Sequence, residues 1–493
     1  MRTTCIILFS LSVAGCAVGP DYTGAPRNPA VAQDHAQLDV TPVAKPDGWW
    51  KTFRDPVLDR LIGEAVEGNQ DVAAAKARIL EARATRAQAV GGLFPAVSGT
   101  GSVLAERSSS TAVPSVGTVQ VDSGSTQFTQ YSGSLDASWE LDLFGAQYRA
   151  VEATSYGVEA AEEDLRYVLV TLVGDVASYY VDATGATERI AIARRNAAEE
   201  RETERLTRAK AAAGSATESD VAKAAALALS TEAEIPSYQN SFAVAAHRIG
   251  VLLGRSPDSV AALLGGRSGV PLPVTRLRAG LPADLLRNRP DVRRAERRLA
   301  QYTARIGQAE AALYPDVSLT GSLASTALRP SDFAKASTVS WSFGPSVSVP
   351  IFDGGKLRAA VDIARAQRDE YLAAYHAAVL TAVEDVENAV VALSTERRRM
   401  RALSASAAYY ETAARSAKIL FENGSSSFLD LLDAQRSLRS AQDSVIQSRM
   451  ANAKDYVALA KALGGGWDRA VDPSVPAVTD EGTGPHPRRR PAA

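Results

Sequence analysis

The stretch YSGSLDASWELDL, residues 131–143, alternates apolar or small residues with polar or charged ones. Leu135 and Trp139 fall in one register, whereas Asp136 and Glu140 fall in the other. An alternation of period two predicts a β-strand with two unlike faces. Strands of soluble sheets usually span about 5–6 residues, so this strand is long. Its partners, and the solvent that meets its apolar face, must be sought in the rest of the chain.

The same succession of motifs occurs twice in the sequence. LFPAVSGTGSV at 93–103 is similar to LYPDVSLTGSL at 313–323, and GSATESDVAKA at 214–224 is similar to GSSSFLDLLDA at 424–434. Self-similarity at a separation of about 210 residues predicts two copies of one structural unit. We assign the first repeat to 51–280 and the second to 281–467.

Each repeat is predicted to contain a helix, a β-hairpin, a very long helix and a shorter return helix. Residues 356–423 include neither Gly nor Pro, so one helix of about 100 Å is expected there. Typical globular helices have about 11–12 residues, and a helix this long builds a stalk rather than a pocket. The other expected elements are helices at 58–91, 146–213 and 290–313, hairpins at about 95–143 and 316–352, and a loop within 105–130.

The start of the chain has the pattern of a bacterial lipoprotein signal. A basic residue and a short apolar run precede VAGC at 13–16. We predict a signal peptide over 1–15, removed before Cys16, with lipid on the Cys16 thiol. The alternative is an ordinary signal peptide with a chance cysteine. The residues after Cys16 are not Asp, which favours the outer membrane over retention in the inner membrane.

The segments at the two ends of the mature chain have loop-like compositions. Residues 16–50 are rich in Pro, Ala and Asp and are predicted to be an extended segment, with Trp49 and Trp50 starting the packed structure. Residues 468–493 are Pro-rich and basic, and we predict a disordered tail.

Composition argues against several functions. The 54 basic and 56 acidic residues leave a formal charge of −2, so no basic field for nucleic acid is expected. The four histidines are not at ligand spacing, and Cys16 would be the sole cysteine of the mature chain. No convergent catalytic set and no phosphate-binding loop are found. We therefore predict a protein that is not an enzyme, without metal and with no cofactor besides the lipid.

Alternating strands with one apolar and one polar face suit a membrane barrel with a wet interior. A sheet in lipid must close without free edges, and the smallest membrane barrels have about eight strands. One chain supplies only four predicted strands. Two chains or three would satisfy closure, and a wider pore makes three more useful.

The sequence resembles the TolC-like outer-membrane factors, in their lipoprotein branch of NodT/OprM-type efflux channels. The motifs that carry the resemblance are GCAVGPDY at 15–22, WWKTFRDPVLDRLI at 49–62, LDASWELDLFG at 135–145, RNRPDVRRAERRL at 287–299, PIFDGGKLRA at 350–359, FLDLLDAQRSL at 428–438 and ALGGGW at 462–467. They extend over nearly the whole chain.

The resemblance implies an α+β membrane protein that works as a homotrimer. It implies a 12-stranded β-barrel in the outer membrane, a long α-helical barrel through the periplasm and a mixed equatorial belt. The implied function is the passive exit channel of a tripartite efflux system. Its implied partners are outer-membrane lipid, a periplasmic adaptor and an inner-membrane pump, of the RND type. A duct for type I protein secretion is the alternative, and a non-conducting trimeric spacer is a weaker one.

One segment combines a helix cap with a potential gate. Ser427 and Asp430 form an S-x-x-D capping pattern, as do Thr217 and Asp220 in the first repeat. Residues alone favour a capping role for Asp430, whereas Asp433 lies beyond the cap.

The resemblance places this segment at the periplasmic tip, where three chains narrow the entrance. It implies acidic rings at Asp430 and Asp433 and an apolar constriction at Leu429. Arg415 and Lys418, on the preceding helix, are possible partners that lock the gate.

Overall fold

The computed structural model describes residues 17–25, 48–108, 126–266, 269–274 and 289–466. These residues form two compact parts. Of the described residues, the sheet part contains 17–25 and those within Ala82–Val158 and Arg297–Ala373, and the helical part contains the others. The predicted signal peptide, Cys16 and the C-terminal tail lie outside the described residues.

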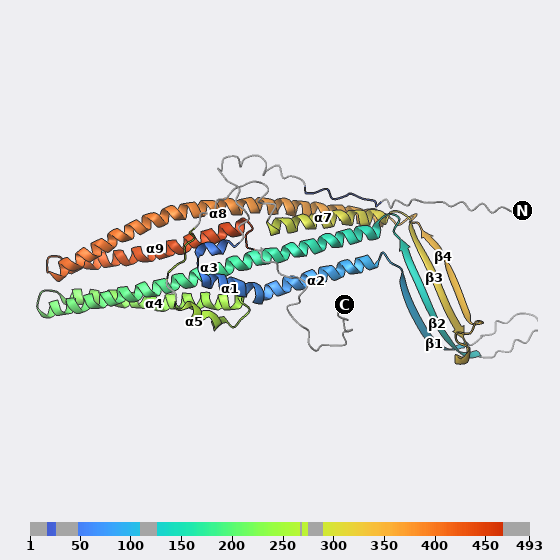
Figure 1. Cartoon of the computed structure of the whole chain (residues 1–493), viewed down its shortest axis with the longest axis horizontal. Helices are drawn as coiled ribbons and strands as arrows, with labels where there is room; N and C mark the ends of the chain where they lie inside the picture. Colours follow the sequence, from blue (N-terminus) through green and yellow to red (C-terminus); the bar gives the residue numbers. More distant parts are fainter. Residues whose placement is uncertain (1–16, 26–47, 109–125, 267–268, 275–288, 467–493) are drawn as a thin grey trace, which may run out of the picture. The chain divides into compact units, whose positions relative to one another are not determined.

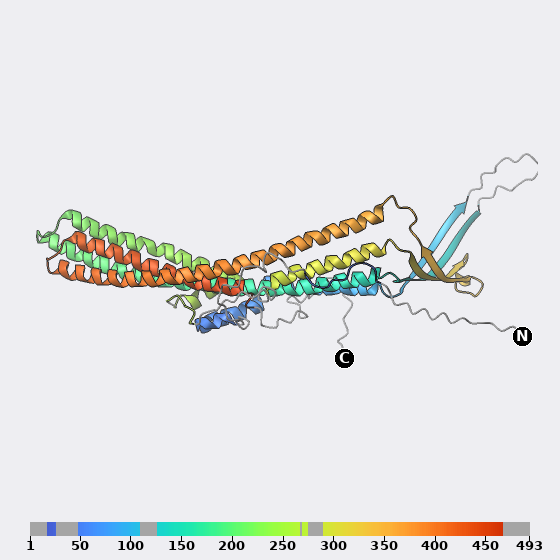
Figure 2. The same ribbon diagram turned by 90° about the horizontal axis from the view of Figure 1, so that it is seen from above.

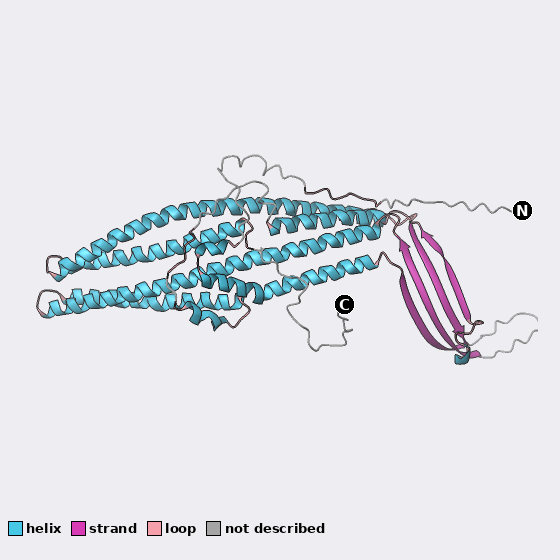
Figure 3. Cartoon of the chain, viewed as in Figure 1, coloured by secondary structure: helices cyan, strands magenta, loops and turns pink. Residues whose placement is uncertain are grey.

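All strands of the described chain belong to one antiparallel sheet in the order β1-β2-β3-β4 (Figure 3). Its strands are β1 (Ala96–Ser108), β2 (Thr126–Leu141), β3 (Asp316–Ala327) and β4 (Val339–Ser348). Each repeat therefore contributes one hairpin, as predicted. The strands reach further into the predicted loop than expected, because Ser108 pairs with Thr126; residues 109–125 lie outside the described chain.

The strand register confirms the two unlike faces. Leu135 pairs with Gly99 and with Leu323, which in turn pairs with Trp341, so these residues share one face. The next row pairs Ser98, Asp136, Ser322 and Ser342 on the other face. Trp341 is 78% exposed and Leu135 56% exposed, which leaves the apolar face open.

The two long helices agree with the predicted ranges to within one residue (Figure 1). They are α3 (Ala146–Ala212) and α8 (Lys356–Glu422), and each is followed by a return helix, α4 (Glu218–Leu252) or α9 (Phe428–Ala462). Pro290 begins α7 (Pro290–Ala311), as its fixed φ favours. Among the described helices, none combines the length and the apolar character needed to cross a bilayer.

The expected single helix at 58–91 was wrong. The structure has α1 (Pro56–Gly68) and α2 (Gln70–Gly91), separated by an extended Asn69. The Asn69 carboxamide accepts the backbone N–H groups of Asp71 and Val72, and its amide donates to the Leu252 carbonyl at 2.9 Å. Asn69 thus starts a new helix because its side chain replaces the missing backbone acceptors.

The helical part has a core that begins at the predicted position. A short 3₁₀ helix, η1 (Trp49–Phe53), buries both tryptophans, and Phe53 packs edge-on against Tyr456 of α9. Three smaller elements complete the described chain: η2 (Pro257–Val260), α5 (Ala261–Leu264) and η3 (Pro330–Asp332).

A ladder of polar contacts joins the two repeats inside the helical part. Helices α3 and α9 run antiparallel, with ion pairs spaced about every seven residues along α3. The pairs are Asp175–Lys461 at 3.1 Å, Asp182–Lys454 at 2.6 Å and Arg189–Asp443 at 2.7 Å.

Candidate functional site at the hairpin tips

The α3–α4 and α8–α9 turns lie at the same end of the helical part (Figures 1 and 2). Both turns use the same backbone device. Gly214 and Gly424 adopt φ of +76° and +73°, and the next residue donates its N–H to the carbonyl five residues back. This is the glycine C-cap that ends a helix and reverses the chain within a few residues.

A capping box starts each return helix, as the sequence predicted. The Ser427 hydroxyl accepts the Asp430 N–H at 3.2 Å, and the Asp430 carboxylate accepts the Ser427 N–H at 3.2 Å. Thr217 and Asp220 repeat this geometry on α4. Hydrogen bonds from the side chains of Ser427 and Ser426 lower the pKa of Asp430 below its usual range. Its capping role is confirmed, and the carboxylate stays ionised.

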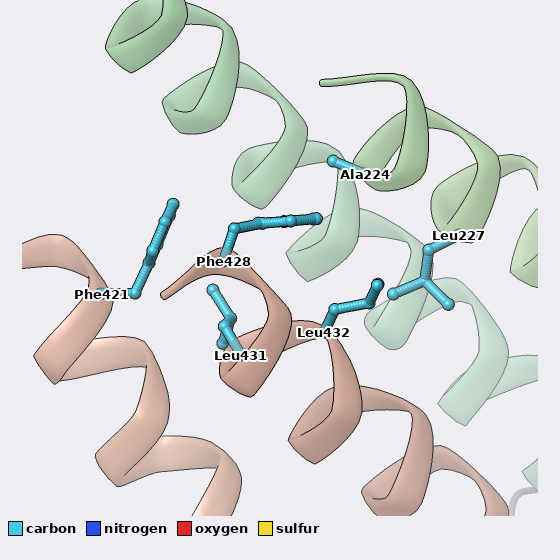
Figure 4. Packing of buried hydrophobic residues seen from close by; sticks show 6 residues of the cluster. All are labelled: Ala224, Leu227, Phe421, Phe428, Leu431 and Leu432. Atoms are coloured by element: carbon cyan, nitrogen blue, oxygen red, sulfur yellow. The ribbon is translucent and has the colours of Figure 1, made fainter. Parts of the chain in front are cut away.

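Alternate faces of the first turn of α9 serve different environments. Phe428, Leu431 and Leu432 turn inward and pack with Phe421 of α8 and with two residues of α4 (Figure 4). The α4 residues are Ala224 and Leu227. This tip cluster ties the two hairpins of one chain together by apolar burial.

The three predicted gate residues occupy the opposite, exposed face of that turn. Leu429 is 62% exposed, and Asp430 and Asp433 are exposed as well. Asp433 lies one helical turn beyond Leu429, so the two acids and the leucine form one continuous surface. Leu429 is therefore a largely exposed apolar side chain beside two carboxylates.

The structure adds a residue that sequence reasoning missed. The Lys210 ammonium near the end of α3 donates to the Phe421 carbonyl and lies 4.2 Å from the centre of the Phe421 ring. A cation at the last turn of a helix complements the free carbonyls there, and this was the available signal. Its acceptor belongs to the other repeat, which only the tertiary structure reveals.

The proposed locking residues make contacts within their own chain. Arg415 pairs with Glu411 one turn earlier on α8 at 3.0 Å, with both side chains well exposed. A hydrogen bond from Arg205 is the main cause of the lowered pKa of Glu202 on α3, and the charge of Lys418 adds to this lowering. A link from either residue to a gate carboxylate of another chain stays a prediction.

The polar face of the sheet carries a second set of candidate residues. Hydroxyl groups of adjacent strands meet there, Thr100 with Ser134 at 2.8 Å and Ser102 with Ser132 at 2.7 Å. Ser134 also donates to Asp136 at 2.6 Å. Such a surface suits water rather than lipid.

The family model described as outer membrane efflux protein matches residues 61–255 and again 281–465. The chain belongs to this family. The first matched segment contains the hairpin β1–β2 followed by α3 and α4, and the second contains the hairpin β3–β4 followed by α8 and α9. The resemblance inferred from the motifs is thereby confirmed, and the protein is an outer-membrane efflux channel.

Two relatives illustrate how far the likeness extends within the family. Nodulation protein T of Rhizobium leguminosarum bv. trifolii is 36% identical over 470 residues, which cover 93% of this chain and 96% of that protein. The solvent efflux pump outer membrane protein SrpC of Pseudomonas putida is 32% identical over 477 residues, which cover 93% of this chain and 97% of the relative.

Solved structures of channels in the family have the same fold. The outer-membrane channel OprN matches with a TM-score of 0.81 and 36% identity, over 92% of this chain and 100% of that one. The open state of the Neisseria gonorrhoeae MtrE outer membrane channel matches with a TM-score of 0.79 and 29% identity, over 92% and 99% of the two chains.

Proposed function

We propose that three copies of this chain form the outer-membrane exit duct of a tripartite efflux system. The observation that carries the proposal is the four-stranded sheet with one exposed apolar face and one hydroxyl-lined face. In this assembly the sheets close into a 12-stranded barrel, and the long helices continue the duct through the periplasm.

Closure follows from the physical demands of lipid. Strands β1 and β4 are the edges of the described sheet, so each carries backbone groups that need a partner. An unpaired backbone group in hydrocarbon costs several kcal/mol. A whole unpaired strand edge would repeat this cost at many residues, so an open sheet would not be stable in the bilayer. Pairing β1 of one copy with β4 of the next satisfies both edges. Three copies give an interior wide enough for water and small solutes.

The apolar face supports a lipid contact because nothing in the described chain covers most of it. Phe343, Trp341 and Val97 are at least 70% exposed on that face. The opposite face, with its rows of Ser and Thr, would line the aqueous lumen.

Transport through such a duct is passive, and energy would come from an inner-membrane pump, of the RND type, acting through a periplasmic adaptor. Relatives named as efflux-pump components support efflux rather than type I protein secretion.

The exposed surface of Leu429, Asp430 and Asp433 is proposed as the periplasmic gate. Three copies would bring three leucines and six carboxylates around one opening. Arg415 and Lys418 are proposed as cross-chain partners that hold the tips together. A covalent lipid on Cys16 would anchor the chain in the same membrane.

The decisive experiment is single-channel recording with the purified full-length protein in planar bilayers. We expect discrete conductance steps and, by native mass spectrometry in detergent, a mass of three 52.0-kDa chains less their signal peptides. A stable trimer without conductance, even after removal of the gate leucine, would favour the spacer. A dimer would overturn the 12-stranded barrel.

A further inference from the structure

The residues that follow Cys16 are seated in a socket within the sheet part. The Val18 N–H donates to the Phe144 carbonyl at 3.1 Å, and Tyr22 packs edge-on against Tyr156 of α3. We call residues 17–22, AVGPDY, the strap. The rest of the predicted extended segment, residues 26–47, lies outside the described chain.

One arginine organises the socket. The Arg149 side chain on α3 is only 2% exposed. Its guanidinium donates to the Val18 carbonyl at 3.1 Å, to the Gly19 carbonyl at 3.2 Å and to the Asp21 carboxylate at 2.7 Å. The remaining guanidinium nitrogen, Nη1, donates to the Glu152 carboxylate at 2.7 Å. Three of its four partners thus belong to the strap.

The buried charge of Arg149 is well matched only while the strap is bound. A buried guanidinium is costly unless its charge and its N–H groups are all matched. Without the strap, Arg149 would keep Glu152 alone among these partners. The planar fork of arginine also suits two adjacent carbonyls in a way that the single ammonium of lysine does not.

Backbone contacts make the socket selective for its occupant. A side chain at Gly19 would put its Cβ 2.3 Å from the Cα of Gly307 on α7, and Gly19 has φ of +92°. A side chain at Gly145 would come within 2.7 Å of the Ala17 Cα. Two close backbone approaches, of Gly19 to Gly307 and of Ala17 to Gly145, therefore define where the strap can lie.

The socket lies where the strands end and aromatic side chains gather. Phe144, which accepts the strap's hydrogen bond, stacks on Tyr314 with ring centres 4.7 Å apart. Trp139 donates to the Leu93 carbonyl at 3.0 Å, and Phe352 is 92% exposed. Aromatic residues at strand ends mark the level of the membrane–water interface in barrels.

We propose that Arg149 is a positioning residue that holds the strap at the membrane interface and so fixes the level at which the acyl chains of Cys16 enter the lipid. The partner of this surface is the periplasm-facing lipid leaflet. Cys16 is one Cα step, about 3.8 Å, from Ala17, so fixing the strap fixes the anchor. The inference rests on the proposed lipidation, and its test separates the two.

The test uses a nitroxide attached through Pro20→Cys, because Pro20 is an exposed strap residue. The full-length protein is reconstituted in phosphatidylethanolamine–phosphatidylglycerol vesicles, and spectra are compared with and without Arg149→Ala. In the chain that keeps Arg149, we expect the nitroxide to be immobilised and to be more accessible to oxygen than to a water-soluble nickel chelate. In Arg149→Ala, we expect the rotational correlation time of the nitroxide to be several-fold shorter. Arg365→Ala is the matched control, since Arg365 is exposed and pairs with Glu310 in the same part.

A strap-side variant guards against misfolding. The Asp21 side chain is 81% exposed, so Asp21→Asn weakens the clamp without disturbing the socket, and we expect an intermediate mobility. A label that is mobile in the unmodified chain, or unchanged by Arg149→Ala, would overturn the proposal. Cys16→Ser should abolish palmitate labelling yet leave the label immobile. Undiminished palmitate labelling of the Cys16→Ser protein would instead disprove lipidation of Cys16 and, with it, the role of the strap in placing the lipid anchor.

Discussion

At the scale of single residues, a buried carboxyl group of the helical part occupies an unfavourable place. Glu200 on α3 is 3% exposed, and one of its oxygens has no hydrogen-bond partner in the described chain. Thr231 of α4 bonds to it, but burial prevails and raises the Glu200 pKa. The charged neighbours are Glu199 on the same helix, Glu234 on α4 and Arg439 on α9.

Replacing this carboxyl group should stabilise the protein in a pH-dependent way. A raised pKa means that Glu200 holds its proton more tightly in the folded state than in the unfolded state. Glu200 therefore lowers the free energy of unfolding once the pH rises above 4.5, the ordinary pKa of a glutamate. Glu200→Gln keeps the acceptor for Thr231 and should raise the thermal midpoint at pH 7–8, with the gain fading toward pH 4.5. Circular dichroism melting curves measure it.

Glu202 provides a control of opposite sign. Its side chain is 45% exposed, and a hydrogen bond from the Arg205 guanidinium lowers its pKa. Glu202→Gln should therefore give no gain at neutral pH. An equal gain in both variants would show that general charge reduction, rather than burial of Glu200, is responsible.

The capping boxes allow a second residue-scale prediction. Ser427→Ala removes the acceptor of the Asp430 N–H and should cost about 1 kcal/mol of local helix stability. That cost corresponds to roughly five-fold faster amide hydrogen exchange in the first turn of α9. Thr217→Ala should have the same effect on α4 and none on α9. Faster exchange in both helices of either variant would mean that the tips unfold as one unit.

At the scale of elements, sequence periodicity predicted what depends on local physics. Alternation in 131–143 predicted β2, because it gives the two faces of one strand different polarity. The absence of Gly and Pro predicted α8, because no residue of that stretch interrupts a helical backbone. Sequence periodicity did not predict the break at Asn69, because the Asn69 amide donates to the carbonyl of Leu252, which is far away in sequence. The Lys210–Phe421 contact escaped for the same reason.

The faces of the sheet allow a matched pair of variants on adjacent residues. Leu135→Arg puts a charge among Leu323 and Trp341 on the apolar face, at a cost of about 2–4 kcal/mol per chain near the bilayer midplane. Ser134→Arg adds the same group on the polar face beside Asp136. We expect only Leu135→Arg to reduce the heat-resistant trimer on electrophoresis. Equal assembly of both variants would show that the lipid and lumen faces have been assigned wrongly.

At the scale of the whole molecule, the proposed gate sets electrostatics against packing. Two carboxylates about 8 Å apart repel by about 2 kcal/mol at an effective dielectric constant near 20, so an acidic ring cannot close itself. Closure must come from elsewhere. The tip cluster and Lys210 fasten the two hairpins of one chain, and cross-chain links are proposed for Arg415 and Lys418. The ring is thus left free to select ions.

The gate prediction follows from this division of roles. Asp433→Ala should weaken cation selectivity and block by divalent cations, measured as reversal potentials in a salt gradient, without touching a helix cap. Adding Asp430→Ala should weaken both further, but it also breaks a capping box, so Asp220→Ala serves as its control on α4. Leu429→Ala should raise the resting conductance and admit large antibiotics such as vancomycin, because it widens an apolar constriction while the charges remain. If the reversal potential and cation block of the double variant equal those of the unmodified channel, Asp430 is a helix cap alone and Asp433 a solvated surface residue.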